Sequence, residues 1–258
     1  MIDSRDVQHV FVSPHLDDVV FSCGGLIAAM VRSGVDVSIV TVFTAQPYRL
    51  NAEALLFHRE CGMGVDGIEK RRNEDLAAAR ILGVTTEHLG LFEAIYRVTS
   101  TGVPRYSLRD ESYLEVTTEP ATLRAVGDVL RMALRNREKA RIYAPLGIGR
   151  HVDHLMVRSA IEHHVSSAAP PNCNLAYYEE LPYGRLGGRY ALRPPEPVGW
   201  RRECRPKVPS ERDWRVKWAA CLAYTSQTHT LWASEENMRS CLLLVDGRSP
   251  EAIWGRAS

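Results

Sequence analysis

The sequence predicts a doubly wound α/β fold, in which helices cover both faces of a mostly parallel sheet. Strand and helix patterns alternate along most of the 258 residues. The first strand, helix and strand follow one another as in a right-handed parallel crossover. Neither an internal repeat nor a shift in composition marks a domain boundary, so we expect a single domain over residues 1–258 with long loops.

The first crossover unit has the clearest signals. An apolar run at residues 10–13 predicts a buried strand, and residues 21–31 predict a helix that Gly34 ends. Residues 35–43 alternate and are rich in Val, Ile and Thr, so they predict the second strand.

The alternation continues beyond this unit. Further strands are expected at residues 88–91, 141–146 and 175–180. Further helices are expected at residues 69–82, 121–136 and 151–165, with a last helix at 213–226. Stretches rich in polar residues, Gly and Pro break the pattern at residues 44–67, 100–118 and 182–209. Long loops of this kind often line a binding site, so we expect these three to shape a pocket.

Composition excludes several classes of protein. The hydrophobic fraction of 45%, the charged fraction of 24% and the net charge of +1 are those of an ordinary globular protein without a nucleic-acid footprint. No apolar run approaches the roughly 20 residues that span a bilayer, and the polar N-terminus does not resemble a signal peptide. The six cysteines show no C-x-x-C pairing, which favours reduced thiols. We therefore expect a cytoplasmic protein with neither membrane nor nucleic-acid partners.

Two clusters of ligating side chains each follow a predicted strand. They are His15–Leu16–Asp17–Asp18 and His151–Val152–Asp153–His154. Because parallel strands end at the same edge of a sheet, we expect the two turns to lie side by side. Each cluster places two ligating residues three positions apart, a spacing that can direct both at one point. Two histidines and one carboxylate would leave open positions on Zn²⁺, with Fe²⁺ as an alternative.

The adjacent carboxylates suggest a division of roles. Asp18 would be a metal ligand, and Asp17 would act as general base on a metal-bound water whose pKa is lowered towards about 7. One of His151 and His154 would be a ligand, which leaves the other to stabilise the oxyanion. Asp153 lies between them and can orient an imidazole from behind.

Each cluster taken alone also fits a structural role. Asp is favoured at helix N-caps, and H-x-D-H is compatible with a solvated first helical turn. The occurrence of both clusters directly after apolar strands favours a metal site.

These residues resemble the signature of a known family. Pro14–His15–Leu16–Asp17–Asp18 and Cys23–Gly24–Gly25 are similar to the motif of the PIG-L (LmbE-like) zinc-dependent N-acetylglucosaminyl deacetylases. The similarity continues at Arg71–Arg72–Asn73–Glu74, Ala78, Leu82–Gly83, residues 89–97, Pro145–Leu146–Gly147 and residues 151–154. It covers about the first two thirds of the chain and implies a Rossmann-like fold.

The resemblance also implies roles for individual residues. The metal ligands would be His15, Asp18 and His154. Asp17 would be the general base, and His151 would stabilise the oxyanion or protonate the leaving amine.

Two further residues correspond to substrate-binding positions of the family. Arg71 matches the arginine that contacts sugar hydroxyls, and Glu93 stands where many members carry a sugar-binding Asp. Glu93 is longer by one methylene, which leaves the substrate pose open. Leu16 replaces the commoner Pro and Val19 replaces a common Glu, but neither is a ligand, so the chemistry should be retained.

The predicted function is hydrolysis of the N-acetyl or N-acyl group of an amino sugar, such as an N-acetylglucosamine conjugate. An amidase acting on a thiol conjugate or an acylated antibiotic is an alternative. Another is a non-catalytic module that binds a sugar or nucleotide at the first turn and Gly24–Gly25. The presence of both Asp17 and His151 favours the enzyme. A dinucleotide enzyme is disfavoured because no G-x-G-x-x-G follows the first strand. The sequence is compatible with a homo-oligomer.

Overall fold

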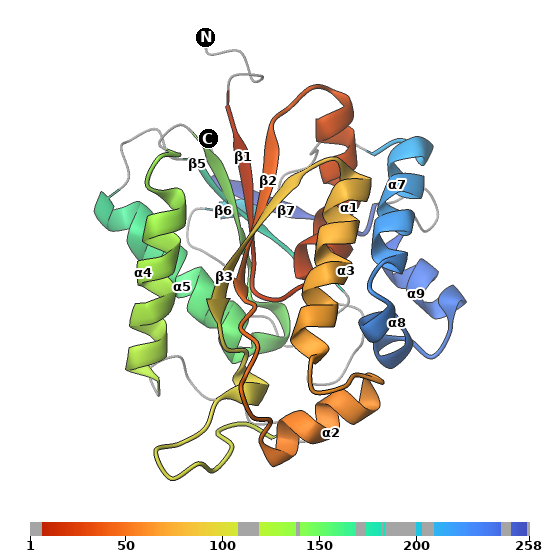
Figure 1. The fold of residues 1–258 in the computed structure, drawn as a ribbon. Helices are drawn as coiled ribbons and strands as arrows, with labels where there is room; N and C mark the ends of the chain where they lie inside the picture. Colours follow the sequence, from red (N-terminus) through yellow and green to blue (C-terminus); the bar gives the residue numbers. More distant parts are fainter. Residues whose placement is uncertain are drawn as a thin grey trace.

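A mostly parallel sheet forms the centre of the molecule (Figure 1). The computed structural model describes residues 7–107, 119–137, 140–168, 174–181, 183, 200–202, 209–243 and 249–256. Within these residues the sheet has seven strands in the order β3-β2-β1-β4-β5-β7-β6. Their bounds are β1 His9–Ser13, β2 Val37–Phe43, β3 Thr85–Leu91, β4 Arg141–Pro145, β5 Asn174–Tyr178, β6 Trp200–Arg202 and β7 Ile253–Arg256.

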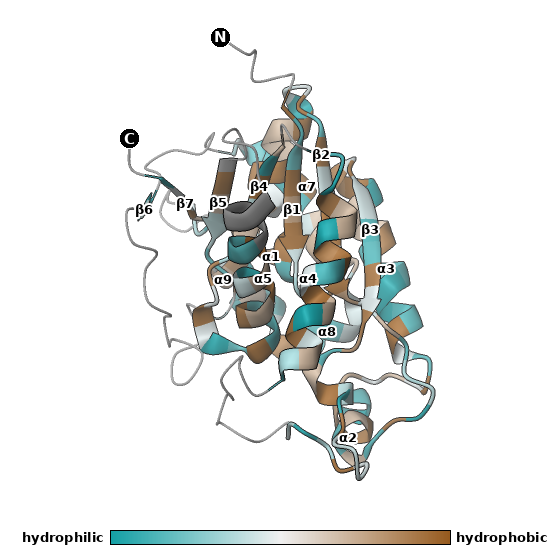
Figure 2. Ribbon diagram, turned by 90° about the vertical axis from the view of Figure 1, so that its left-hand side faces the viewer, coloured by the Kyte–Doolittle hydropathy of each residue, from teal (hydrophilic) through white to brown (hydrophobic). Residues whose placement is uncertain are grey.

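Strands β1 to β5 pair in parallel, whereas β7 is antiparallel to both β5 and β6. The central strand β1 is buried on both faces, which explains its unbroken apolar sequence. Figure 2 shows β1 largely in the hydrophobic colour, whereas the edge strand β3 is paler and more polar. The predicted α/β class with a mostly parallel sheet is confirmed.

Helices cover both faces of this sheet (Figure 1). Their bounds are α1 Asp18–Arg32, α2 Ala52–Glu60, α3 Gly67–Leu82, α4 Pro120–Leu134, α5 Val152–Ala168, α7 Glu211–Leu222, α8 Thr225–Leu231 and α9 Glu235–Leu242. Helices α1, α3 and α7 pack on one face with Phe11 and Ile39 of the sheet. Helices α4 and α5 pack on the other face with Val10 and Val40. In the described part of the chain, no helix is long and apolar enough to span a membrane.

The structure differs from the sequence prediction mainly near the C-terminus. The predicted last helix ends early, at Leu222, and α8 and α9 follow it. Strands β6 and β7 were not predicted, because three or four residues are too few to display an alternating pattern. The loop at 182–209 and the stretch at 100–118 lie largely outside the described residues.

Helix α1 begins at Asp18, three residues before the predicted start. The polar pair Asp17–Asp18 suggested a longer turn, but an acidic residue in the first helical turn is favourable because of the helix dipole. The helix therefore starts directly at the turn, and its first residue belongs to the ligating cluster.

The glycine pair in α1 makes room for α7 rather than for a ligand. A Cβ atom at Gly24 would lie 2.9 Å from Cγ of Lys217, and one at Gly25 would lie 2.8 Å from Cζ3 of Trp214. The Lys217 ammonium is 2.8 Å from Glu251, which also accepts from the Gly25 backbone N–H. Because protein atoms already fill this space, the pair cannot serve a binding module as a ligand cradle.

Candidate active site

The first turn joins β1 to α1 and is tightly bonded within itself. The Ser13 hydroxyl donates to the His15 carbonyl at 2.7 Å and accepts from the Val19 N–H at 3.2 Å. The Phe43 N–H donates to the Pro14 carbonyl at 2.9 Å, which ties the turn to the end of β2. The side chains of the turn are also buried. Its ligating groups are therefore held in one arrangement.

The second turn, between β4 and α5, has an unusual backbone. Gly147 and Gly149 have φ angles of 89° and 81°, and the 3₁₀ turn Ile148–Arg150 lies between β4 and α5. Arg150, at φ 54°, is the one non-glycine residue among those described whose φ lies in the left-handed range. Such a conformation costs energy for a residue with a Cβ and is often found beside functional sites. This turn leads directly to His151, the first residue of the second cluster.

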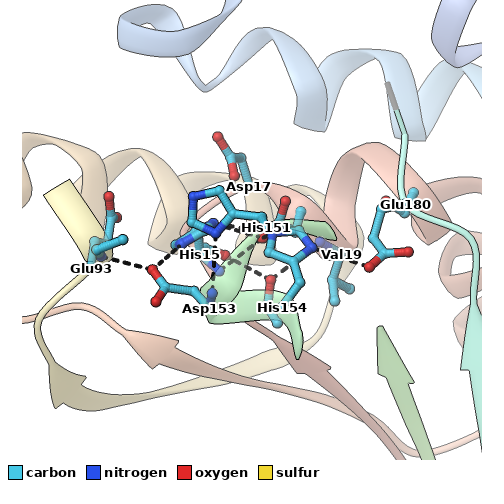
Figure 3. A network of polar contacts seen from close by, with 12 residues as sticks. His15, Asp17, Val19, Glu93, His151, Asp153, His154 and Glu180 are labelled. Carbon is cyan, nitrogen blue, oxygen red and sulfur yellow. Dashed lines mark hydrogen bonds and ion pairs between the residues drawn. The ribbon is translucent and has the colours of Figure 1, made fainter. Parts of the chain in front are cut away.

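Three ligand atoms from the two turns converge. The distances are 3.3 Å between His15 Nδ1 and His154 Nε2, 3.2 Å between His15 Nδ1 and Asp18 Oδ2, and 3.2 Å between His154 Nε2 and Asp18 Oδ2. Figure 3 shows the imidazoles of His15, His151 and His154 grouped together. The edge of a tetrahedral zinc site with ordinary Zn–N bonds is roughly 3.3 Å. His151 is close by, and nitrogens of the three imidazoles lie within 4.8 Å of one another. This donor set fits a divalent metal ion.

A buried carboxylate lies behind each of two imidazoles. His15 Nε2 is 3.0 Å from Asp153 Oδ2, and His154 Nδ1 is 3.1 Å from Glu180 Oε1. The other ring nitrogen of each histidine therefore faces the cluster, as in carboxylate–histidine–metal arrangements. Asp153 contacts the imidazole of His15, from the other turn, whereas the sequence pattern had suggested one of its own neighbours.

The sequence patterns assign no catalytic or ligating role to Glu180. Its fully buried carboxylate accepts from the Gly147 N–H at 2.6 Å and the Ile148 N–H at 3.1 Å. It therefore joins the glycine-rich turn to the His154 ring. The sequence offers two signals: Glu180 ends the predicted strand at 175–180, on the same edge of the sheet as the two clusters, and residues 178–183 resemble a segment of the family near the pocket.

The remaining predicted residues line the same region. Arg71, from α3, donates from Nη1 to Glu93 Oε1 at 2.5 Å, and its Nη2 is 3.9 Å from Asp17 Oδ2. All three side chains are buried, and the Arg71 guanidinium lies 5.8 Å from the Phe57 ring centre. The structure thus connects both predicted substrate-contacting residues to the carboxylate next to Asp18.

Burial and charge shift the protonation of this cluster. Burial and the neighbouring charge of Asp18 raise the pKa of Asp17 to about 8, although Arg71 opposes the shift. Burial also lowers the pKa of His151 to about 3, so this imidazole is neutral at pH 7. For Asp18, burial would raise the pKa, but the charge of His154 and the hydrogen bonds from both imidazoles outweigh it and hold the pKa well below its ordinary value.

The same balance appears on the imidazole side. Burial would lower the pKa of His154, yet Asp18 outweighs it and the pKa rises to about 9. Asp18 is therefore an anion that draws positive charge to this point. A metal ion supplies such charge and displaces the proton when it binds.

Comparison with known proteins shows the family of this chain. The model of the PIG-L family, described as GlcNAc-PI de-N-acetylase, matches residues 10–165. The chain belongs to the PIG-L family. The matched region includes all of β1 except His9, both ligating turns and the segment that carries Arg71 and Glu93.

Two curated relatives bear the same name, 2'-N-acetylparomamine deacetylase. The one from Streptomyces fradiae is 34% identical over 69% of this chain and 58% of its own length. The one from Niallia circulans is 29% identical over 88% of this chain and 82% of its own length. This chain thus spans somewhat more than half of the Streptomyces protein.

Among solved structures, a zinc-inhibited form of the teicoplanin deacetylase Orf2 is similar over nearly the whole chain. The TM-score is 0.79 at 25% identity, with 98% of this chain and 99% of that chain covered. The shared fold therefore extends beyond the region that the family model matches.

Proposed function

We propose that this protein is a metal-dependent N-deacetylase, which hydrolyses the acetamide of a small-molecule amino-sugar conjugate to acetate and a free amine. The convergence of His15, Asp18 and His154 beside Asp17 and His151 is the observation that carries this proposal. The family membership and the names of the relatives support it.

His15, Asp18 and His154 would hold the metal ion. The fit rests on their mutual distances and on the two carboxylates that fix the imidazole rings. Zn²⁺ is the expected ion, with Fe²⁺ as the alternative for the same ligand types. When bound, such an ion polarises the amide carbonyl and lowers the pKa of water beside it.

Asp17 would accept the proton of the attacking water. Its carboxylate is buried, adjacent to Asp18 in sequence and near the Arg71 guanidinium, so it remains within the site without being a ligand. A carboxylate beside the attacking water can take its proton and then give it to the leaving amine.

His151 would act on the oxygen of the reacting carbonyl. Its ring lies 4.9 Å from that of His15 and 5.4 Å from that of His154, measured between ring centres. The Asp153 N–H donates to its Nδ1 at 3.2 Å, which leaves Nε2 as the ring nitrogen that can carry a hydrogen. That N–H would donate to the oxyanion of the tetrahedral intermediate.

Arg71 and Glu93 would bind the sugar. Their ion pair offers a cationic donor and an anionic acceptor side by side, which suits neighbouring hydroxyl groups. The names of the curated relatives favour an N-acetylated aminoglycoside-type sugar as the substrate class. Catalysis in the cytoplasm, by a monomer or a homo-oligomer, remains a prediction from sequence.

The test is release of free amine and acetate from a panel of N-acetylated sugars by the zinc-loaded protein. The panel should include 2'-N-acetylparomamine, N-acetylglucosamine and a glycopeptide carrying an N-acetylated sugar. We expect equal amounts of amine and acetate from at least one of them, with the Asp17→Asn variant as the control. Stoichiometric zinc in the protein without amine release from any panel member would contradict the proposal.

A further inference from the structure

The carboxylate of Asp153 joins two parts of the site. It is fully buried and has three partners on two segments. Oδ2 lies 3.0 Å from His15 Nε2 and accepts from the Ala94 N–H at 2.8 Å, and Oδ1 accepts from Arg97 Nη1 at 2.7 Å. One carboxylate thus contacts a proposed metal ligand and the turn that follows β3 (Figure 3).

Arg97 holds the same turn from its other side. Its Nη1 also donates to the Phe92 carbonyl at 3.0 Å. Phe92 and Ala94 are the residues on either side of Glu93, so Arg97 and Asp153 together fix the backbone on both flanks of the proposed sugar-binding residue. A displaced Arg97 would therefore release both the Asp153 carboxylate and the support of Glu93.

The environment of Arg97 limits its own movement. The side chain is buried, and Nε donates to Glu119 Oε1 at 3.1 Å. The guanidinium lies 5.6 Å from the ring centre of Phe43 and 5.1 Å from that of Tyr106. Two carboxylates and two aromatic rings thus fix a planar group whose fork can serve Asp153, Glu119 and a carbonyl together.

We propose that Arg97 is a positioning residue, which acts through Asp153 to fix the His15 imidazole and the turn that carries Glu93. This inference rests on the proposed function, because it assigns Arg97 to the alignment of the metal-binding and sugar-binding halves of that site. A purely structural ion pair would stabilise the fold without affecting metal affinity. The two roles therefore differ in a measurable way.

The experiment measures Zn²⁺ affinity by competition with a chromophoric chelator, without substrate, together with the thermal unfolding temperature. The variants are Arg97→Met, Arg97→Lys, Asp153→Asn and the double variant Arg97→Met/Asp153→Asn. Lys217→Met is a matched control, because Lys217 is likewise buried and contacts a carboxylate and an aromatic ring, but at Glu251 and Trp214.

We expect Arg97→Met to weaken zinc binding by about 10–100-fold, as loss of support behind a ligand usually does. Arg97→Lys should weaken it less, because an ammonium retains the charge but cannot span the same partners. The double variant should bind zinc no more weakly than Asp153→Asn alone, since Arg97 acts through that carboxylate. Lys217→Met should keep zinc affinity within about twofold, because its partners lie outside the two turns.

Wild-type zinc affinity in folded Arg97→Met, or a further loss in the double variant, would overturn the inference. If Arg97→Met does not fold, wild-type affinity in folded Arg97→Lys would overturn it instead. Because no substrate is present, the result is independent of the deacetylase proposal. Weakened zinc binding without amine release from any sugar would leave the role of Arg97 standing, whereas amine release with unchanged zinc affinity would leave only the deacetylase proposal.

Discussion

Replacement of Glu180 by Gln should weaken metal binding and stability together. The carboxylate accepts three hydrogen bonds, from the Gly147 N–H, the Ile148 N–H and His154 Nδ1. The Gln side chain has the same shape but only one acceptor oxygen. If this oxygen takes the place of Oε1, the new NH₂ group faces the Ile148 N–H.

The expected loss of stability follows from the number of hydrogen bonds that residue 180 can still accept. One buried backbone donor loses its partner, which costs about 1–3 kcal/mol of unfolding free energy. In a chain of this size about 2 kcal/mol corresponds to a decrease of roughly 4–8 °C in Tm. The His154 ring also loses its anionic partner, so Zn²⁺ affinity should fall by about 10–100-fold.

Chelator competition and thermal unfolding provide the two measurements. Glu179→Gln is the matched control, because the neighbouring carboxylate is also buried but accepts from Trp254 Nε1 at 3.0 Å and lies 3.4 Å from Arg202 Nε. A Glu180→Gln protein that loses stability but binds Zn²⁺ as tightly as the wild type would refute the assigned orientation of His154.

Three further predictions concern single residues. Asp17→Asn should keep the metal and lower turnover by about 10²–10⁴-fold, because the general base is lost; near-normal turnover at full metal content would exclude that role. His154→Ala should lose bound metal, and elemental analysis that finds normal content would reject it as a ligand. Gly25→Ala should lower stability by about 1–3 kcal/mol in denaturant unfolding, because its Cβ would lie 2.8 Å from Trp214; an unchanged midpoint would show that α1 and α7 can separate.

Much of the fold could be predicted from local patterns. The alternation of Val, Ile and Thr at residues 37–43 defined β2, and Gly83 marked the end of α3 with its left-handed backbone. Such signals depend on neighbouring residues, and a parallel sheet then brings the ends of its strands together. Strand β7 shows no such local signal in the sequence. It is held instead by antiparallel pairing with β5 and β6, which are distant from it in sequence.

The sequence by itself indicated which residues carry the proposed chemistry, since both clusters follow strands whose carboxyl ends a parallel sheet places at one edge. Only the tertiary structure decided how they are supported. Asp153 lies behind His15, 138 residues away, and Glu180 lies behind His154. Gly24 and Gly25 face α7 rather than a ligand. Periodicity and spacing describe neighbours along the chain, whereas the partner of a buried carboxylate depends on which distant segments pack beside it.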